Sequence, residues 1–185
     1  MKPKIIFFGT PNFAVEVLKE IYNGEIEIQA VVTSPDKKSG RGRKVNSSPV
    51  KKFCLEKKIK FYQPSNLKEK SFISTIKSYK SDIYVVVAFR MIPEVVWSIP
   101  KIGTFNLHAS LLPEYRGAAP INWVLINQES ITGLTTFIID NKIDTGKILL
   151  QSKYKIKDGE TYDTLHDNLL EIGKKLVLNT IQILF

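Results

Sequence analysis

Residues Phe105–Ile121 read FNLHASLLPEYRGAAPI, a short apolar strand that breaks into an irregular loop. Asn106 and His108 stand two positions apart in the strand, and alternate residues of a strand point to the same face of a sheet. Both side chains are therefore expected to reach one small group. Two prolines and a glycine in the loop prevent regular pairing, and open α/β sheets bind ligands at such loops after the carboxyl end of a strand.

A second turn, IDTG at Ile143–Gly146, supplies a carboxylate at Asp144. An amide, an imidazole and a carboxylate together can donate to a carbonyl oxygen, shuttle a proton and orient the shuttle. A lone histidine in an apolar run is more often a buried core residue, but the neighbouring amide and the proline-bounded loop favour chemistry. We therefore expect Asn106, His108 and Asp144 to be catalytic.

The start of the chain predicts a parallel crossover. Lys4–Phe8 (KIIFF) is a continuous apolar run ended by a glycine, as a central strand would be. Asn12 is expected to cap a helix over about Phe13–Tyr22, and the next strand is predicted at Ile26–Thr33. A strand, a helix and a strand of this spacing predict a right-handed parallel connection.

The rest of the chain continues this alternation. Further strands are predicted at Phe61–Tyr62, Ile83–Ala88, Thr104–Leu107, Thr132–Ile139 and Lys147–Ile156, and further helices at Pro49–Lys57, Lys68–Lys80, Pro93–Ser98, Pro120–Asn127 and Thr161–Leu184. The predicted fold class is α/β, a Rossmann-like open and mostly parallel twisted sheet with helices on both faces and an antiparallel edge strand, forming one domain over residues 1–185. The last helix is expected to bury a stripe of Tyr162, Leu165, Leu169, Ile172, Leu176, Thr180 and Leu184, with His166 as a structural residue beside it.

The turn after the first strand, Gly9-Thr10-Pro11-Asn12, has one glycine where a dinucleotide-binding turn has three. A nicotinamide cofactor is therefore not expected. Two interpretations of the turn remain open: a tight turn with a helix cap, or a border of the substrate cleft formed by Thr10 and the helix start.

Composition indicates a soluble globular protein. Of the 185 residues, 43% are hydrophobic and 24% charged, and no apolar run approaches the roughly 20 residues that span a bilayer. We expect a cytoplasmic location and no membrane partner. The single Cys54 is interpreted as a small core residue. Two histidines and one cysteine without metal-ligand spacing predict no metal site.

The net charge of +9 indicates either a polyanionic partner or a solvated lysine-rich surface. Cations cluster in Ser34–Ser48, a segment without apolar periodicity that is expected to be a long loop at the carboxyl end of a strand, on the sheet edge of the His108 loop. The clustered cations are Lys37, Lys38, Arg41, Arg43 and Lys44. Two glycines flank Arg41, whose planar guanidinium suits phosphates and base edges.

These motifs carry a resemblance. FNLHASLLPEYRGAAPINW followed by IDTGKIL resembles the folate-dependent formyltransferase family, in which the H-x-S-L-L-P loop carries the active site. GTPNFA near the start, and SPDKKSGRGRK followed by SPVK, narrow the resemblance to the methionyl-tRNA formyltransferase branch. The resemblance extends from Ile5 to about Leu184, with the motifs in the family's order.

The resemblance implies the formyltransferase fold, 10-formyltetrahydrofolate as formyl donor, and the α-amino group of methionine on initiator tRNA as acceptor. Asn106 and His108 would stabilise the oxyanion of the tetrahedral intermediate. Asp144, directly or through an ordered water, would take the amine proton and keep His108 protonated for the leaving nitrogen. The basic loop, with Arg41 foremost, would meet the acceptor end of the tRNA.

The resemblance also implies binding residues around the chemistry. The loop after the strand at Ile83–Ala88 suits a pterin, and many relatives have glycine where Arg90 stands, so that this guanidinium could face the folate's glutamate tail instead. The expected folate-binding residues are Phe89, Arg90, Met91, Ile92, Ser110, Leu111, Leu112 and Pro113, of which the last three are also candidates for mere loop scaffold. Thr10, Arg116 and Gly117 are expected to border the acceptor cleft, with a structural ion pair as the alternative for Arg116.

Family members usually continue into a basic C-terminal β-barrel, whereas this sequence stops at Phe185. The barrel is therefore expected to be absent, and two interpretations stay open: a fragment with the catalytic domain alone, or a reduced protein that relies on the Arg41 loop. We also expect a monomer. Two other enzymes remain as alternatives. A glycinamide ribonucleotide formyltransferase would need a G-x-G-x-N turn that GTPN does not match, whereas sugar-nucleotide formyltransferases can share similar motifs. A non-catalytic RNA-binding domain is the alternative of another class, favoured only by the charge.

Overall fold

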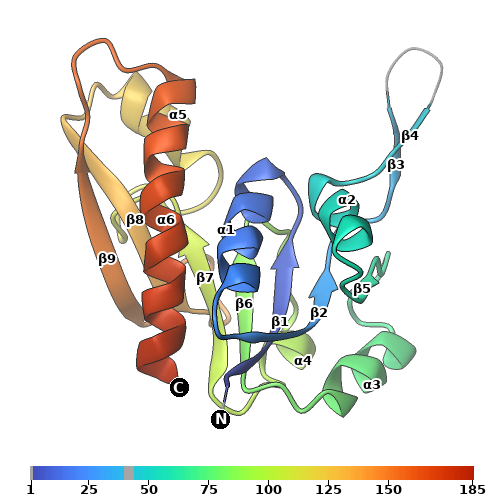
Figure 1. Cartoon of the computed structure of the whole chain (residues 1–185). Helices are drawn as coiled ribbons and strands as arrows, with labels where there is room; N and C mark the ends of the chain where they lie inside the picture. Colours follow the sequence, from blue (N-terminus) through green and yellow to red (C-terminus); the bar gives the residue numbers. More distant parts are fainter. Residues whose placement is uncertain (1, 40–43) are drawn as a thin grey trace. The chain divides into compact units, whose positions relative to one another are not determined.

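β1 (Lys4–Gly9) lies in the middle of a parallel sheet in the computed structural model, which describes residues 2–39 and 44–185 (Figure 1). It pairs with β2 (Glu27–Val32) on one side and β6 (Ile83–Val87) on the other, and β5 (Phe61–Tyr62) pairs with β2. These strands belong to the first of two compact units, Met1–Thr104. The expected parallel crossover from β1 to β2 is confirmed.

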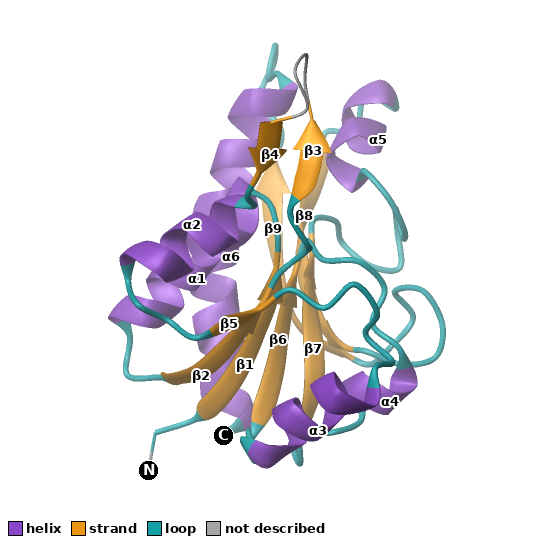
Figure 2. Cartoon of the chain, turned by 90° about the vertical axis from the view of Figure 1, so that its right-hand side faces the viewer, coloured by secondary structure: helices purple, strands orange, loops and turns teal. Residues whose placement is uncertain are grey.

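Helices cover both sides of the strands of this unit. Figure 2 shows α1 (Asn12–Asn23) and α2 (Pro49–Glu56) on one side, and α3 (Lys70–Ser78) and α4 (Glu94–Trp97) on the other. All residues of β6 are buried, which explains why its sequence is a continuous apolar run instead of an alternating one. Cys54 of α2 is fully buried, and burial raises the pKa of its thiol to about 12, as expected for a core residue.

Two predictions in this unit were wrong. Asn12 does not cap α1, since it is the first helical residue, and Pro11 at the N-cap position offers no side-chain acceptor. The segment expected to be a plain loop contains an antiparallel hairpin of β3 (Lys37–Ser39) and β4 (Lys44–Asn46). The two strands pair through their backbones and have three residues each, too few for hydrophobic periodicity to indicate a strand.

The second unit, Phe105–Phe185, contains an antiparallel sheet. The end of β7 (Gly103–His108) pairs with β8 (Ile131–Ile138), which pairs with β9 (Ile148–Lys155). Pro120 begins α5 (Pro120–Ile126), as its missing N–H and fixed φ favour. The expected antiparallel strand near the end of the chain is confirmed as β9.

The long helix α6 (Tyr162–Leu184) packs on one face of this sheet. Thr136 of β8 and Thr180 of α6 are fully buried and their hydroxyl oxygens are 2.8 Å apart. Because side chains alternate along β8, Thr135 points to the opposite face. That opposite face is also the face of His108, which lies directly across from Thr135 in the β7–β8 register.

The predicted stripe of α6 was correct at four of its seven positions. Leu165, Leu169, Leu176 and Thr180 are buried, but Tyr162 is exposed and Ile172 and Leu184 are half-buried. The buried face turns instead through Leu170, Gly173, Val177 and Ile181. His166 lies beside the buried face and contacts the Tyr162 ring, and its interpretation as a structural residue remains a prediction. No helix among the described residues combines the length and apolar character needed to cross a bilayer.

The N-terminus of α6 gives a first prediction. The Thr161 hydroxyl accepts from the Thr164 backbone N–H, and the Thr164 hydroxyl accepts from the Thr161 N–H, forming a reciprocal capping box. Thr161→Ala is expected to lower the free energy of unfolding by about 1 kcal/mol in urea denaturation. Thr75→Ala, at a half-buried position inside α3, is the control, and equal stability of Thr161→Ala and wild type would contradict the prediction.

A second prediction concerns acid. Lys51 Nζ lies 2.5 Å from Asp36 Oδ2 and Gln63 donates to Asp36 Oδ1, and these contacts lower the pKa of the Asp36 carboxyl. They therefore stabilise the fold above the unfolded pKa, about 3.9, and the contribution is lost as pH falls through the lower folded pKa. The stability difference between wild type and Asp36→Asn is expected to shrink on acidification. Urea titrations over a pH series measure it, with Asp158→Asn as control, and a difference independent of pH would overturn the prediction.

Candidate active site

The second unit brings the three predicted catalytic residues to one place. His108 Nδ1 lies 3.6 Å from Asp144 Oδ2, and the two side chains are only 8% and 16% exposed. Asn106 stands two residues before His108 on the same strand and therefore on the same face. The convergence expected from the sequence is thus present for the imidazole and the carboxylate, with the amide on the same side of the sheet.

The His108 ring lies between two oxygen acceptors. Nε2 is 2.9 Å from the carbonyl oxygen of Tyr115, which can only accept, and Nδ1 faces the Asp144 carboxylate. A neutral imidazole has one N–H and would point its lone pair at one of these oxygens. An N–H on Nε2 donates to the Tyr115 carbonyl, and a second N–H on Nδ1 would point toward the Asp144 carboxylate.

Asp144 is held through its backbone and one carboxylate oxygen. Gly117 N–H donates to Oδ2 at 2.8 Å, and Arg116 Nε donates to the Asp144 carbonyl at 2.9 Å. Arg116 therefore makes no ion pair with this carboxylate in the described structure. Among the described residues, Asp144 Oδ1 has no hydrogen-bond partner, and it is left to accept a proton from elsewhere.

Three of the residues that make these contacts have a positive φ angle. Tyr115 and Asp144 adopt left-handed conformations, with φ of 54° and 51°. Gly117 has φ of 87°, a conformation suited to glycine, and it directs its N–H to the carboxylate. Such backbone strain is common at functional sites, where the surrounding structure must hold it.

Asn106 is half-buried, and no side-chain hydrogen bond of its carboxamide occurs within the part of the chain that the structure describes. Its N–H₂ group is therefore available to a substrate oxygen that approaches this face of the strand. An available donor next to a fixed imidazole is the arrangement that stabilises an oxyanion.

Two anchors of the S-L-L-P loop were missed by the sequence analysis. The buried Thr135 hydroxyl donates to the Ser110 carbonyl at 2.7 Å and accepts from Leu112 N–H at 3.0 Å. Gln151 of β9 donates to Leu112 O and to Thr135 Oγ1, each at 2.9 Å. The pairing of β8 with β7 and β9 brings these residues under the loop, and the sequence does not show this pairing. Two adjacent threonines in an apolar strand could, however, have indicated a buried polar contact.

The turn that carries Asp144 is fixed by Asp140, which was also missed. Its carboxylate accepts from Lys142 N–H and the Thr145 hydroxyl, both at 2.9 Å. A side chain on Gly146 would place Cβ 1.7 Å from the Ile138 carbonyl oxygen, so only glycine fits there. An aspartate followed two residues later by a backbone donor is a recognisable turn signature in the sequence D-N-K.

The predicted folate-binding residues of the second unit, Ser110–Pro113, range from fully buried to exposed. The hydroxyl of the fully buried Ser110 donates to Glu114 O. Leu112 is buried, Leu111 is half-buried and lies against Gly133, and Pro113 is exposed. The loop therefore has its own internal contacts, and the folate roles of these residues remain predictions.

The other predicted binding residues lie in the first unit. Thr10 Oγ1 is 3.0 Å from Ser34 Oγ. Arg90 donates to the carbonyls of Pro64 and Ser65 and lies over the Phe89 ring, so its guanidinium has partners within the protein. Met91 is 75% exposed, whereas Ile92 is buried.

The basic cluster is described only in part. Lys37, Lys38 and Lys44 belong to the β3–β4 hairpin, and Lys37 is exposed. Arg41 and Arg43 lie outside the described residues, so their predicted tRNA contacts stay predictions.

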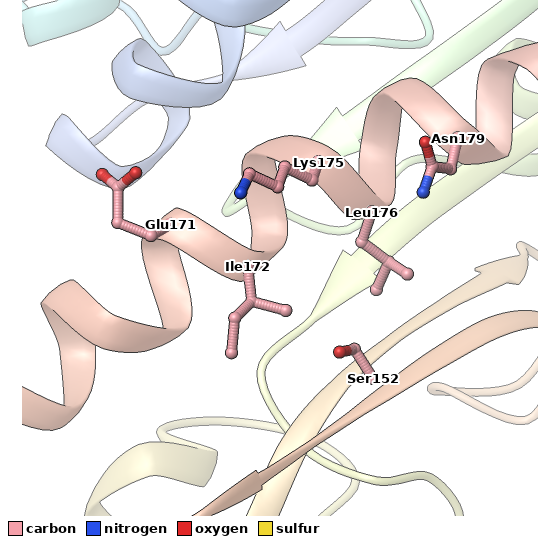
Figure 3. Close-up of a pocket in the computed structure, with 6 residues that line it drawn as sticks. All are labelled: Ser152, Glu171, Ile172, Lys175, Leu176 and Asn179. Carbon is pink, nitrogen blue, oxygen red and sulfur yellow. The ribbon is translucent and has the colours of Figure 1, made fainter.

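A hollow of about 300 Å³ lies between α6 and β9, away from the candidate catalytic residues. Its lining residues are Ser152, Glu171, Ile172, Lys175, Leu176 and Asn179 (Figure 3). Ser152 pairs with Leu134 across β8 and β9, which places it on the sheet face that α6 covers. His108 and Thr135 lie on the opposite face, so this hollow is separate from the candidate active site.

The sequence model of the formyl transferase family matches residues 3–181. The chain belongs to the formyl transferase family. It is 49% identical over 178 residues to the methionyl-tRNA formyltransferase of Bacteroides thetaiotaomicron, covering 96% of this chain and 55% of that one. A similar match, 49% identity over 183 residues, is made with the enzyme of the same name from Flavobacterium johnsoniae, covering 99% of this chain and 58% of that one. The chain thus spans little more than half the length of these relatives.

Solved structures of formyl transferases share the fold. Phosphoribosylglycinamide formyltransferase from Streptococcus pneumoniae has a TM-score of 0.80 at 17% identity, covering 100% of this chain and 99% of that one. A sugar 3N-formyl transferase, studied in the presence of dTDP and 5-N-formyl-THF, has a TM-score of 0.72 at 25% identity, covering 100% of this chain and 63% of that one. These likenesses confirm the predicted α/β formyltransferase fold.

Thr135 and Thr136 give a matched pair for testing the loop anchor. Thr135→Val and Thr136→Val each remove a buried hydroxyl, and each is expected to cost about 1–2 kcal/mol of unfolding free energy. Only Thr135 accepts from the Leu112 amide, so only Thr135→Val is expected to accelerate hydrogen exchange at Leu112 beyond the global loss. Equal exchange at Leu112 in the two variants would show that Thr135 does not anchor the loop.

Proposed function

We propose that this chain transfers a formyl group from 10-formyltetrahydrofolate to the α-amino group of methionine on initiator tRNA. The observation that carries the proposal is the placement of His108 between Asp144 Oδ2 and the Tyr115 carbonyl, with the carboxamide of Asn106 on the same strand face. The name of the relatives at 49% identity supports this acceptor over a small amine.

In the first step the neutral amine attacks the formyl carbon, and negative charge develops on the formyl oxygen. The Asn106 carboxamide, which has no other partner among the described residues, donates to this oxygen. His108 adds the positive charge of its imidazolium nearby, since its ring faces acceptors at both nitrogens. Removing one such donor costs about 100-fold to 1000-fold in rate.

Two protons must then move. The amine nitrogen becomes positive on attack and gives its proton to Asp144, whose Oδ1 is unengaged by described residues while Oδ2 is fixed by Gly117 N–H. The leaving folate nitrogen takes a proton from His108 at Nδ1, because Nε2 is occupied by the Tyr115 carbonyl. Transfer of the proton from Asp144 Oδ1 to His108 Nδ1 through an ordered water restores both groups, since the nearer carboxylate oxygen, Oδ2, lies 3.6 Å from Nδ1 and is fixed by Gly117.

The donor and acceptor contacts are assigned from the sequence and its resemblance. The loop that follows β6, with Phe89 and Ile92, and the S-L-L-P loop are each proposed to contact the folate. The basic segment Ser34–Ser48, whose sequence includes Arg41 and Arg43, is the proposed contact with the tRNA acceptor end, since closely spaced cations bind phosphates. Thr10, Arg116 and Gly117 are proposed to border the methionyl group, although in the structure Arg116 and Gly117 also hold Asp144.

Asn106→Ala is expected to lower kcat for formyl transfer about 100-fold to 1000-fold without unfolding the protein, because it removes only an oxyanion donor. Single-turnover transfer from labelled 10-formyltetrahydrofolate to methionyl initiator tRNA measures this. Asn179→Ala, on the α6 side of the sheet, is the matched control. Turnover in Asn106→Ala equal to that of the control would remove the residue from the mechanism.

The acceptor is tested directly with alternative substrates. Methionyl initiator tRNA is expected to be formylated, whereas glycinamide ribonucleotide and an amino-sugar nucleotide are not. Arg41→Ala is expected to raise KM for the tRNA and leave folate binding unchanged. Preferential formylation of a small amine would replace the proposed acceptor, and tRNA binding without any formyl transfer would favour a non-catalytic RNA-binding domain.

A further inference from the structure

Tyr115 connects the candidate catalytic histidine to a group of polar residues outside the site. Its backbone carbonyl accepts from His108 Nε2 at 2.9 Å. Its side-chain hydroxyl donates to Glu129 Oε1 and accepts from Asn127 Nδ2 at 3.0 Å. The backbone of this residue therefore faces the chemistry, while its side chain is fixed from the other side.

The partners of the hydroxyl are held by backbone hydrogen bonds to α5. Asn127 and Glu129 directly follow α5, and their backbone N–H groups donate to Trp123 O and Val124 O, each at 2.9 Å. The end of α5 thus sets where the carboxylate and the amide stand. Both are exposed side chains that make no contact with the reacting groups in the described structure.

The conformation of Tyr115 requires such support. It is a bulky residue with φ of 54°, a left-handed conformation that L-residues other than glycine, asparagine and aspartate seldom adopt. Such a conformation persists only where neighbouring contacts over-determine it. Release of the hydroxyl would let residue 115 relax, and relaxation rotates the peptide whose carbonyl faces His108.

From these contacts we infer that Glu129 and the Tyr115 hydroxyl are positioning residues, which act together to hold the Tyr115 carbonyl against His108 Nε2 and so fix the orientation of the imidazole. This inference deepens the proposed function and, for its kinetic consequence, rests on it. The sequence pattern alone gave Tyr115, Asn127 and Glu129 no role.

The kinetic test is a double-mutant cycle. Tyr115→Phe keeps the ring and removes the hydroxyl, and Glu129→Ala removes its acceptor, so each is expected to lower kcat for formyl transfer about 10-fold with little change in KM for either substrate. The double variant should be no slower than the slower single variant, because both act through one bond. Glu129→Gln keeps an acceptor oxygen, so its kcat should be close to that of wild type and well above that of Glu129→Ala. Glu114→Gln removes a nearby charge without changing the Tyr115 hydrogen bond, and its kcat should equal that of wild type.

A spectroscopic measurement tests the inference without using activity. The Nε2 proton of His108, protected by the Tyr115 carbonyl, should give a slowly exchanging downfield NMR resonance in wild type, Glu129→Gln and Glu114→Gln. It should broaden in Tyr115→Phe and Glu129→Ala while thermal unfolding changes little. A resonance unchanged in both of these variants overturns the inference, as do additive losses of kcat. If the resonance behaves as expected across the variants but the wild-type protein transfers no formyl group, the proposed function is refuted and the structural inference about Glu129 and Tyr115 stands.

Discussion

The imidazole of His108 between the Tyr115 carbonyl and the Asp144 carboxylate is the interaction on which the second unit depends. Neither acceptor is supplied by the strand that carries the histidine. The carbonyl comes from the loop after β7, and the carboxylate from the turn between β8 and β9. The loop and the turn are joined to each other through residues 116 and 117, which donate to Asp144. A change in either segment therefore alters the environment of the ring.

The two faces of the antiparallel sheet have separate tasks. Apolar residues and the Thr136–Thr180 contact hold α6 on one face. The other face carries Asn106 and His108, together with Thr135, which supports the S-L-L-P loop from below. Because the side-chain alternation of a strand is strict, one face can be packed for stability while the other keeps polar groups available. The hollow beside α6 belongs to the packed face, so it does not mark the position of the candidate catalytic residues.

The left-handed residues of this unit show how the site is held. Asp144 and Tyr115 both adopt the left-handed conformation, which is costly for a bulky residue such as Tyr115, and both are held by hydrogen bonds. At Gly146 the neighbouring carbonyl leaves no room for a side chain, so the turn cannot vary there. Rigid support of this kind pre-organises charged groups, which is the main source of electrostatic catalysis.

Much of the architecture could be predicted from the sequence. Continuous apolar runs such as KIIFF and IYVVV predicted buried parallel strands, because such runs are visible locally in the sequence. The N-x-H spacing and the IDTG turn predicted candidate catalytic residues, of which the structure brings His108 and Asp144 close together. Three features could not be predicted: the β3–β4 hairpin, the N-cap of α1 and the position of the buried face around α6. Backbone pairing and helix docking depend on neighbours in space, which local sequence patterns do not specify. The contacts of Thr135, Gln151 and the Tyr115–Glu129 pair likewise could not be predicted, because only strand pairing and the end of α5 bring these residues within hydrogen-bond distance. The sequence by itself thus determined which residues can carry the chemistry, whereas the tertiary structure decided what holds them, since hydrogen bonds are made between neighbours in space.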